Sequence, residues 1–156
     1  MTTEVKVEGL EEIRRKLARF PNKFAAAMRD TMLAALYKIW ELVPPYPIAP
    51  AGVDDSGRTG TLGRSLGVSE GGHRFGKPQI FEVKQLGAGT AANFQGEFGT
   101  RVQYAPKVIG DDQRMPWASY WWNLRVVARG AIEPVLKLFQ AMVDEVVRWL
   151  NTQDAL

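Results

Sequence analysis

The chain has 156 residues, of which 46% are hydrophobic and 24% are charged, and it contains no cysteine. This length and balance predict one globular domain over residues 1–156 with one core, and they exclude a chain that is disordered throughout. The absence of cysteine excludes disulfides, thiolate metal sites and cysteine nucleophiles. The net charge of +3 comes from interspersed acidic and basic residues and is too mild to imply nucleic-acid binding.

Neither a secretory signal nor a membrane-spanning helix is expected. The first residues lack a charged region followed by an apolar run. The most apolar stretch, residues 32–43, is interrupted by Lys38 and Glu41. We therefore expect a protein that is made and kept in the cytoplasm.

Two helices are predicted at the N-terminal end. Apolar residues recur at helical spacing from Leu10 to Phe20 among many charged residues. Pro21 cannot continue that helix unbent, but it suits the first turn of a new one. The second helix is predicted over residues 21–43, and its alanines allow a neighbouring element to approach closely.

Residues 44–63 are predicted to form one long exposed loop. Four prolines between Pro44 and Pro50 favour extended backbone, and Gly, Asp, Ser and Thr dominate the rest. A loop of this length in a compact domain is typically functional or disordered.

The next part of the chain predicts strands over residues 65–69, 79–86 and 94 or 97 to 105, with a hairpin over residues 70–78. Thr100, Val102 and Tyr104 alternate with polar residues, as expected of a half-buried antiparallel strand. A last helix is predicted from Ile132 to Leu150. The fold class is α+β: two N-terminal helices, a small antiparallel sheet of three to four strands, and a C-terminal helix packed on the sheet.

No residue pattern predicts catalysis, a cofactor or a metal site. His73 is the only histidine and stands in a glycine-rich hairpin tip. The carboxylate pairs Asp54-Asp55 and Asp111-Asp112 adjoin glycines and are typical of turns. The segment 57–65 contains three glycines but lacks the Gly-Lys-Ser/Thr ending of a phosphate-binding loop. We expect a protein that is not an enzyme.

Trp117, Trp121, Trp122 and Trp149 are a large aromatic content for this length. One interpretation is core packing behind the sheet. The other is a subunit interface, where tryptophan, tyrosine and arginine are enriched.

Several segments together resemble the tail-component (neck or tail-completion) family of long-tailed bacteriophages. The similar segments are the Gly9–Leu17 helix, Phe20-Pro21-Asn22-Lys23, the alanine-rich helix ending in Val43-Pro44, Thr59-Gly60-Thr61-Leu62-Gly63-Arg64-Ser65-Leu66, and Tyr104-Ala105-Pro106-Lys107-Val108. The resemblance implies a virion protein of the head–tail junction or tail terminus, assembled in the host cytoplasm. It also implies a homo-oligomeric ring, often a hexamer, without a catalytic site.

A closed ring needs two different complementary patches on each subunit. The partners that the resemblance implies are further copies of the chain, connector or tail-tube proteins, and weak DNA contact in the ring lumen. We place the interface on the 44–63 loop, the 70–78 hairpin and the tryptophan cluster. The predicted interface residues are Tyr46, Arg58, Thr59, Arg64, His73, Phe75, Trp121 and Trp122.

Two alternatives belong to other classes of protein. Basic residues on the early helices, such as Arg14, Arg15 and Lys23, suggest a small nucleic-acid-binding module, which would bind duplex with strong salt dependence. A small hydrolase would use Asp54, Asp55 or His73, but none of these has an evident partner for nucleophilic catalysis.

Overall fold

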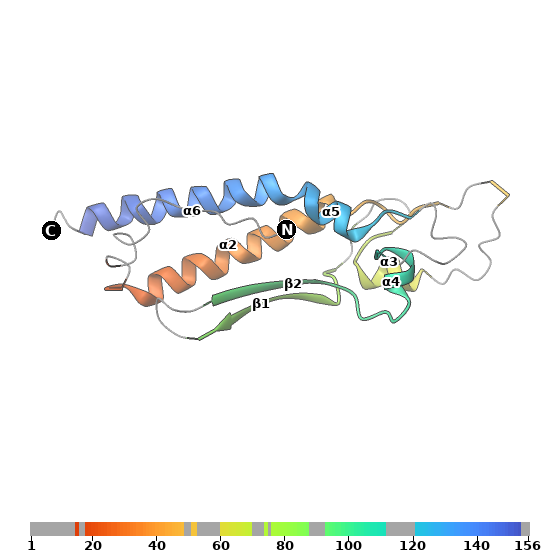
Figure 1. Ribbon diagram of the computed structural model, residues 1–156, viewed down its shortest axis with the longest axis horizontal. Coiled ribbons are helices and arrows are strands. Elements are labelled where there is room, and N and C mark those ends of the chain that lie inside the picture. Colours follow the sequence, from red (N-terminus) through yellow and green to blue (C-terminus); the bar gives the residue numbers. More distant parts are fainter. Residues whose placement is uncertain are drawn as a thin grey trace.

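The computed structural model describes residues 15, 18–48, 51–52, 60–69, 74, 76–87, 93–111 and 121–153. The described chain is α+β, as predicted, and combines helices with a two-stranded antiparallel sheet (Figure 1). Its elements in chain order are α2 (Pro21–Leu42), α3 (Thr61–Ser65), β1 (Ile80–Leu86), β2 (Asn93–Gly99), α4 (Ala105–Val108), α5 (Leu124–Gly130) and α6 (Ile132–Gln153).

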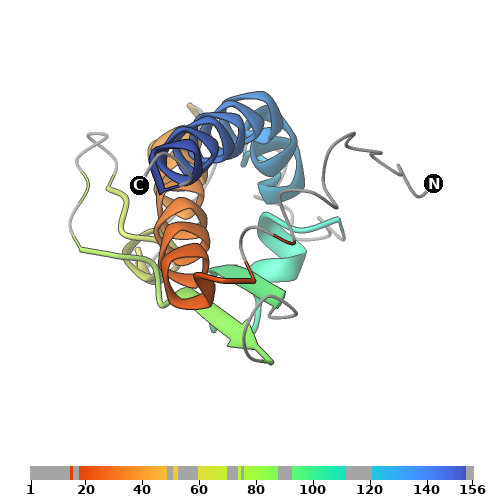
Figure 2. The ribbon, with the colours of Figure 1, turned by 90° about the vertical axis from the view of Figure 1, so that its left-hand side faces the viewer.

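Three layers make up most of the molecule. The long helix α2 lies in the middle, α6 runs along one side of it, and the β1–β2 sheet lies on the other side (Figures 1 and 2). The short helices α3 and α4 gather at the end of the molecule where α2 finishes (Figure 1). In the described part of the chain, no helix is both long and apolar enough to span a bilayer.

Helix α2 confirms the helix that was predicted over residues 21–43. Pro21 occupies its first turn, where the missing N–H costs no hydrogen bond. The helix ends at Leu42, directly before Val43 and the prolines at 44 and 45. Because α6 and the sheet cover it on two sides, apolar residues of α2 are not confined to one face of the helix.

Helix α6 confirms the predicted C-terminal helix. It was expected to pack on the sheet, but it packs on α2. Val146 and Leu150 are buried against aromatic side chains from the start of α2 and the residue before it. The rings of Phe20 and Trp149 meet edge to face with centroids 4.8 Å apart. Small residues such as Ala27 on α2 allow this close contact, which leaves the sheet to the opposite face of α2.

The sheet pairs β1 with β2 in an unbroken register from Ile80↔Gly99 to Leu86↔Asn93. Directly opposite residues share a face, so the pairs Phe81↔Phe98 and Val83↔Gly96 lie on one face. That face is turned toward α2, because the ring of Phe81 contacts Tyr37 of α2, with centroids 4.8 Å apart.

The middle of the other face of the sheet is polar, and Ile80 and Leu86 lie at the two ends of that face. Lys84 Nζ lies 2.7 Å from a carboxylate oxygen of Glu97 and 3.3 Å from one of Glu82. Hydrogen bonds to Glu97 and then to Glu82 raise the pKa of Lys84. The strands therefore show the apolar and polar alternation of a sheet with one buried face.

Of the predicted strands, the first was wrong and the third was wrong in part. Residues 65–69 do not form a strand: Ser65 ends α3, residues 66–67 form a turn, and Val68 makes an isolated bridge with Arg74. The third strand ends at Gly99, because Thr100 Oγ1 accepts a hydrogen bond from Val102 N at 3.1 Å and turns the backbone away. The described residues therefore contain two paired strands where three to four were predicted.

Two further differences concern helices. The predicted helix over Leu10 to Phe20 lies almost entirely outside the described residues, of which only Arg15 and residues 18–20 belong to it. Helix α5 was not predicted. Asn123 caps it by accepting hydrogen bonds from Arg125 N and Val126 N at 2.8 and 3.3 Å, so an asparagine in the sequence was the missed signal.

Gly96 provides a test of the packing between the sheet and α2. A Cβ atom at this position would lie 3.1 Å from Leu36 Cδ2 and 3.2 Å from Met32 Cε. We expect Gly96→Val to lower the free energy of unfolding by about 1–3 kcal/mol, because the larger side chain forces α2 away from the sheet. Denaturant unfolding measures this, with Gly130→Ala, which points into open space, as the control. Equal stabilities of the two variants would contradict the proposed contact.

Candidate assembly surface

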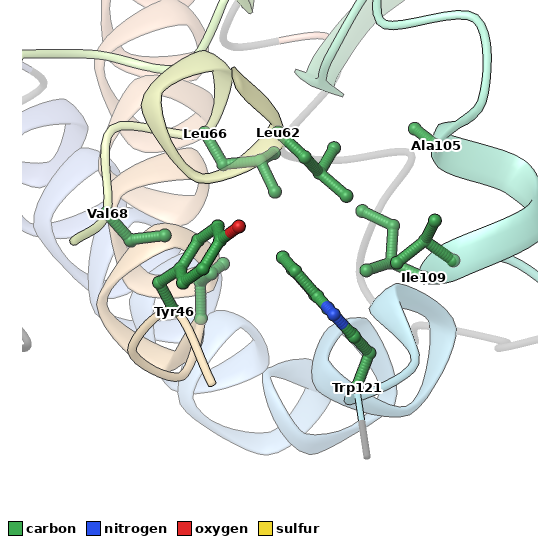
Figure 3. Close-up of a cluster of buried hydrophobic side chains, with 9 residues drawn as sticks. Tyr46, Leu62, Leu66, Val68, Ala105, Ile109 and Trp121 are labelled. Carbon is green, nitrogen blue, oxygen red and sulfur yellow. The ribbon is translucent and has the colours of Figure 1, made fainter. Parts of the chain in front are cut away.

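The largest cluster of buried side chains among the described residues lies where α2 ends, and we call it the base (Figure 3). It contains Tyr46 and Trp121, two of the predicted interface residues. It joins segments that are far apart in the sequence: the chain after α2, helix α3, helix α4 and the start of the segment before α5. Leu66 and Val108 are fully buried at its centre. The chain is therefore packed into this cluster both shortly before residue 49, at Val43 and Tyr46, and shortly after residue 59, at Leu62.

Tyr46 was predicted to lie in an exposed loop, but this prediction was wrong, because Tyr46 is part of the buried base. Its side chain is 6% exposed, and its ring meets the ring of Trp121 edge to face at 4.9 Å (Figure 3). Tyr46 N donates a hydrogen bond to Ser69 O at 3.0 Å. A Cβ atom at Gly63 would overlap the Tyr46 ring, so only glycine allows α3 to approach this closely.

The two adjacent tryptophans differ in their exposure. Trp121 is 6% exposed and belongs to the core, which agrees with the core interpretation of the tryptophan cluster. Trp122 is half-buried, and its Nε1 donates a hydrogen bond to Pro45 O at 3.4 Å. This contact holds the segment after α2 against the segment that leads into α5.

Arg74 closes the C-terminal end of α2. Its guanidinium donates hydrogen bonds to Trp40 O at 2.5 Å, Glu41 O at 2.6 Å and Val43 O at 3.0 Å, and it stacks over the Trp40 ring at 5.0 Å. The last carbonyl groups of a helix have no partner within it, and they carry the negative end of its dipole. Partial burial lowers the pKa of Arg74, while Glu41 opposes that shift.

Helix α3 is tied to both neighbouring layers. Trp40 Nε1 of α2 donates a hydrogen bond to Leu66 O at 2.9 Å. Ser65 Oγ lies 2.6 Å from Thr100 Oγ1, next to the end of β2, and Ser65 O accepts a hydrogen bond from Gln79 N at 2.8 Å. The base is therefore fixed to α2 and to the sheet.

Of the eight predicted interface residues, the structure brings Tyr46, Trp121 and Trp122 together at the base. Arg64 is exposed on α3. Arg58, Thr59, His73 and Phe75 lie outside the described residues. Sequence reasoning missed Arg74, which stands between His73 and Phe75. No local pattern identifies it, because its partners are more than 30 positions away.

A groove of about 350 Å³ separates parts of α2 and α6. Its polar side chains include Lys23, Asp30 and Glu145, and Lys23 Nζ lies 5.7 Å from the centroid of the Trp149 ring.

In the described ranges, no three histidine or carboxylate side chains gather into a metal-binding group. Of the carboxylates considered for chemistry, Asp111 pairs with Arg125 at 2.7 Å, and Asp54, Asp55 and Asp112 lie outside the described residues.

Comparisons with known proteins give no relative for this chain: no family model, no curated protein and no solved structure matches it.

We predict that Arg74 contributes to stability through its hydrogen bonds and not through its charge alone. Arg74→Ala should lower the free energy of unfolding by about 1–2 kcal/mol, because the carbonyls of Trp40, Glu41 and Val43 lose a charged donor. Arg74→Lys should recover only part of this, since an ammonium lacks the planar fork of the guanidinium. Arg64→Ala, at an exposed arginine of α3, should change stability by less than about 0.5 kcal/mol. An equal effect at positions 64 and 74 in denaturant unfolding would refute the prediction.

Proposed function

We propose that the protein is a structural component of the head–tail junction or tail terminus of a long-tailed bacteriophage. It works by ring-forming self-assembly and by contact with neighbouring connector or tail-tube proteins in the virion, after assembly in the host cytoplasm. The order of the sequence motifs that resemble the tail-component family is the starting point for this proposal. The structural observation that supports it is a row of exposed apolar side chains on α5 and α6.

This apolar row consists of Val126, Ile132 and Leu136, whose side chains are 64%, 55% and 60% exposed. Ile132 and Leu136 lie one turn apart on α6, so they occupy the same side of the helix. Single exposed apolar residues are common on protein surfaces, but large apolar side chains that are neighbours on one helix, as Ile132 and Leu136 are, are typical of protein contacts. A ring subunit needs such a surface outside its own core.

The base at the end of α2 supports the same proposal. The described residues on both sides of residues 49–59 are anchored in the base by Tyr46 and Leu62. Ile48 follows this anchor and is 75% exposed. The interface that we propose therefore combines residues 49–59 with the apolar row.

The nucleic-acid-binding alternative has less support from the described residues. Lys38, Lys84, Arg125 and Lys137 each form an ion pair with a carboxylate, so their charges are partly neutralised. Binding to duplex DNA requires several free cations that contact phosphate. A gel shift of the free subunit that disappears between low and physiological salt would favour this alternative over the ring.

The apolar row is tested by the double substitution Ile132→Ser and Leu136→Ser. Both side chains are exposed, so we expect the unfolding free energy to change by less than about 1 kcal/mol. Ring formation, measured by light scattering and negative-stain imaging, should need a protein concentration about tenfold higher, because apolar contact area is lost. Lys137→Ala on the same helix is the control. Unchanged ring formation by the double variant would contradict the role of this row.

Residues 49–59 are tested by replacing them with a glycine and serine linker of equal length. The replacement spares Tyr46, Leu62 and Gly63, which the core requires, so we expect a folded subunit with an unchanged far-UV circular dichroism spectrum. Assembly into rings, or binding to connector or tail-tube proteins, should be lost. A linker variant that still forms normal rings and binds these proteins would exclude the segment from the interface.

A further inference from the structure

We infer that the two outer edges of the β1–β2 sheet join across copies of the chain, so that β2 of one subunit extends the sheet at β1 of the next. This inference deepens the proposed function, on which it rests, by naming the backbone surface through which neighbouring subunits meet. The partner is a second copy of the chain.

Each strand has one edge that pairs with no other described strand. β1 and β2 pair only with each other in the described part of the chain, over seven residue pairs. In an antiparallel pair, every second N–H and C=O of each strand points away from its partner. An edge of this kind is a template for pairing with another strand.

These edges lack two features that usually prevent pairing between molecules, namely proline and a β-bulge. Neither Ile80–Leu86 nor Asn93–Gly99 contains proline, and the register has no bulge. An edge lysine can protect a strand, but the charge of Lys84 is paired with Glu97 and Glu82 on the polar face. The sheet is also only two strands wide, and such sheets gain stability from a further strand.

A second copy fits these edges because the two strands match in length and pattern. Phe94 and Phe98 of an added β2 strand can fall on the face that carries Phe81 and Val83, and these four side chains are only half-buried within one subunit. The β1 edge and the β2 edge are different surfaces, so their union is heterologous. Heterologous contacts generate rings when the rotation between subunits closes.

Hydrogen exchange at low and high protein concentration tests this inference without knowledge of the register. In the dilute subunit, every second amide of β1 and β2 should exchange rapidly. On assembly these amides should exchange at least about tenfold more slowly, because they enter hydrogen bonds between subunits. Rings whose outer strand amides remain unprotected would overturn the inference and leave ring assembly intact. A protein that is monomeric at every concentration would overturn the proposed function together with the inference.

Cross-linking determines which edges meet. The chain has no cysteine, so Glu82→Cys on β1 and Gln95→Cys on β2, prepared separately, each carry a single thiol on the exposed face of the sheet. We expect the mixture to form disulfide-linked pairs of the two variants on non-reducing gels, several-fold more than either variant forms alone. Lys137→Cys on α6, mixed with Gln95→Cys, is the control. Cross-links within each single variant in place of mixed ones would show a symmetric contact and overturn the β1-to-β2 assignment.

Discussion

At the C-terminal end of α2, the guanidinium of Arg74 donates hydrogen bonds to the carbonyl groups of Trp40, Glu41 and Val43. The arrangement of the base depends on this contact. Arg74 pairs with Val68, which belongs to the buried cluster, and Val43 directly follows the helix. Arg74 therefore caps the C-terminal end of the central helix and holds the chain after α3 against it. Trp40 adds to it by stacking under Arg74 while its indole N–H reaches Leu66 O.

Helix α2 links the other parts of the molecule because two layers pack on it. Toward α6, Ala27 leaves room for the side chains around Val146 and Trp149. Toward the sheet, Gly96 leaves room for Leu36 and Met32. In both places the small residue determines how close the layers come, and the large neighbour supplies the buried apolar area. A change at one face of α2 is therefore expected to affect the other layer through the helix.

The three surfaces proposed for assembly belong to different elements. The apolar row lies on α5 and α6, residues 49–59 start from the base, and the open edges lie on β1 and β2. The row and the segment 49–59 act through side chains, whereas the strand edges act through the backbone. Substitutions therefore separate the first two surfaces, and hydrogen exchange isolates the third. A subunit with several distinct surfaces is suited to a position where a ring also contacts proteins above and below it.

The sequence by itself determined the α+β class, the long helix from Pro21, the C-terminal helix and the strand that became β1. These elements follow from local signals: a proline at a helix start, and apolar residues at helical or alternating spacing. Tertiary structure alone decided the helical state of α3, because the segment 61–65 has no strong local signal and is held by contacts with Tyr46, Trp40 and Thr100. It likewise decided that α6 packs on α2, that Tyr46 is buried, and that Arg74 caps α2. Each of these depends on residues far apart in the chain, whose proximity no spacing in the sequence encodes.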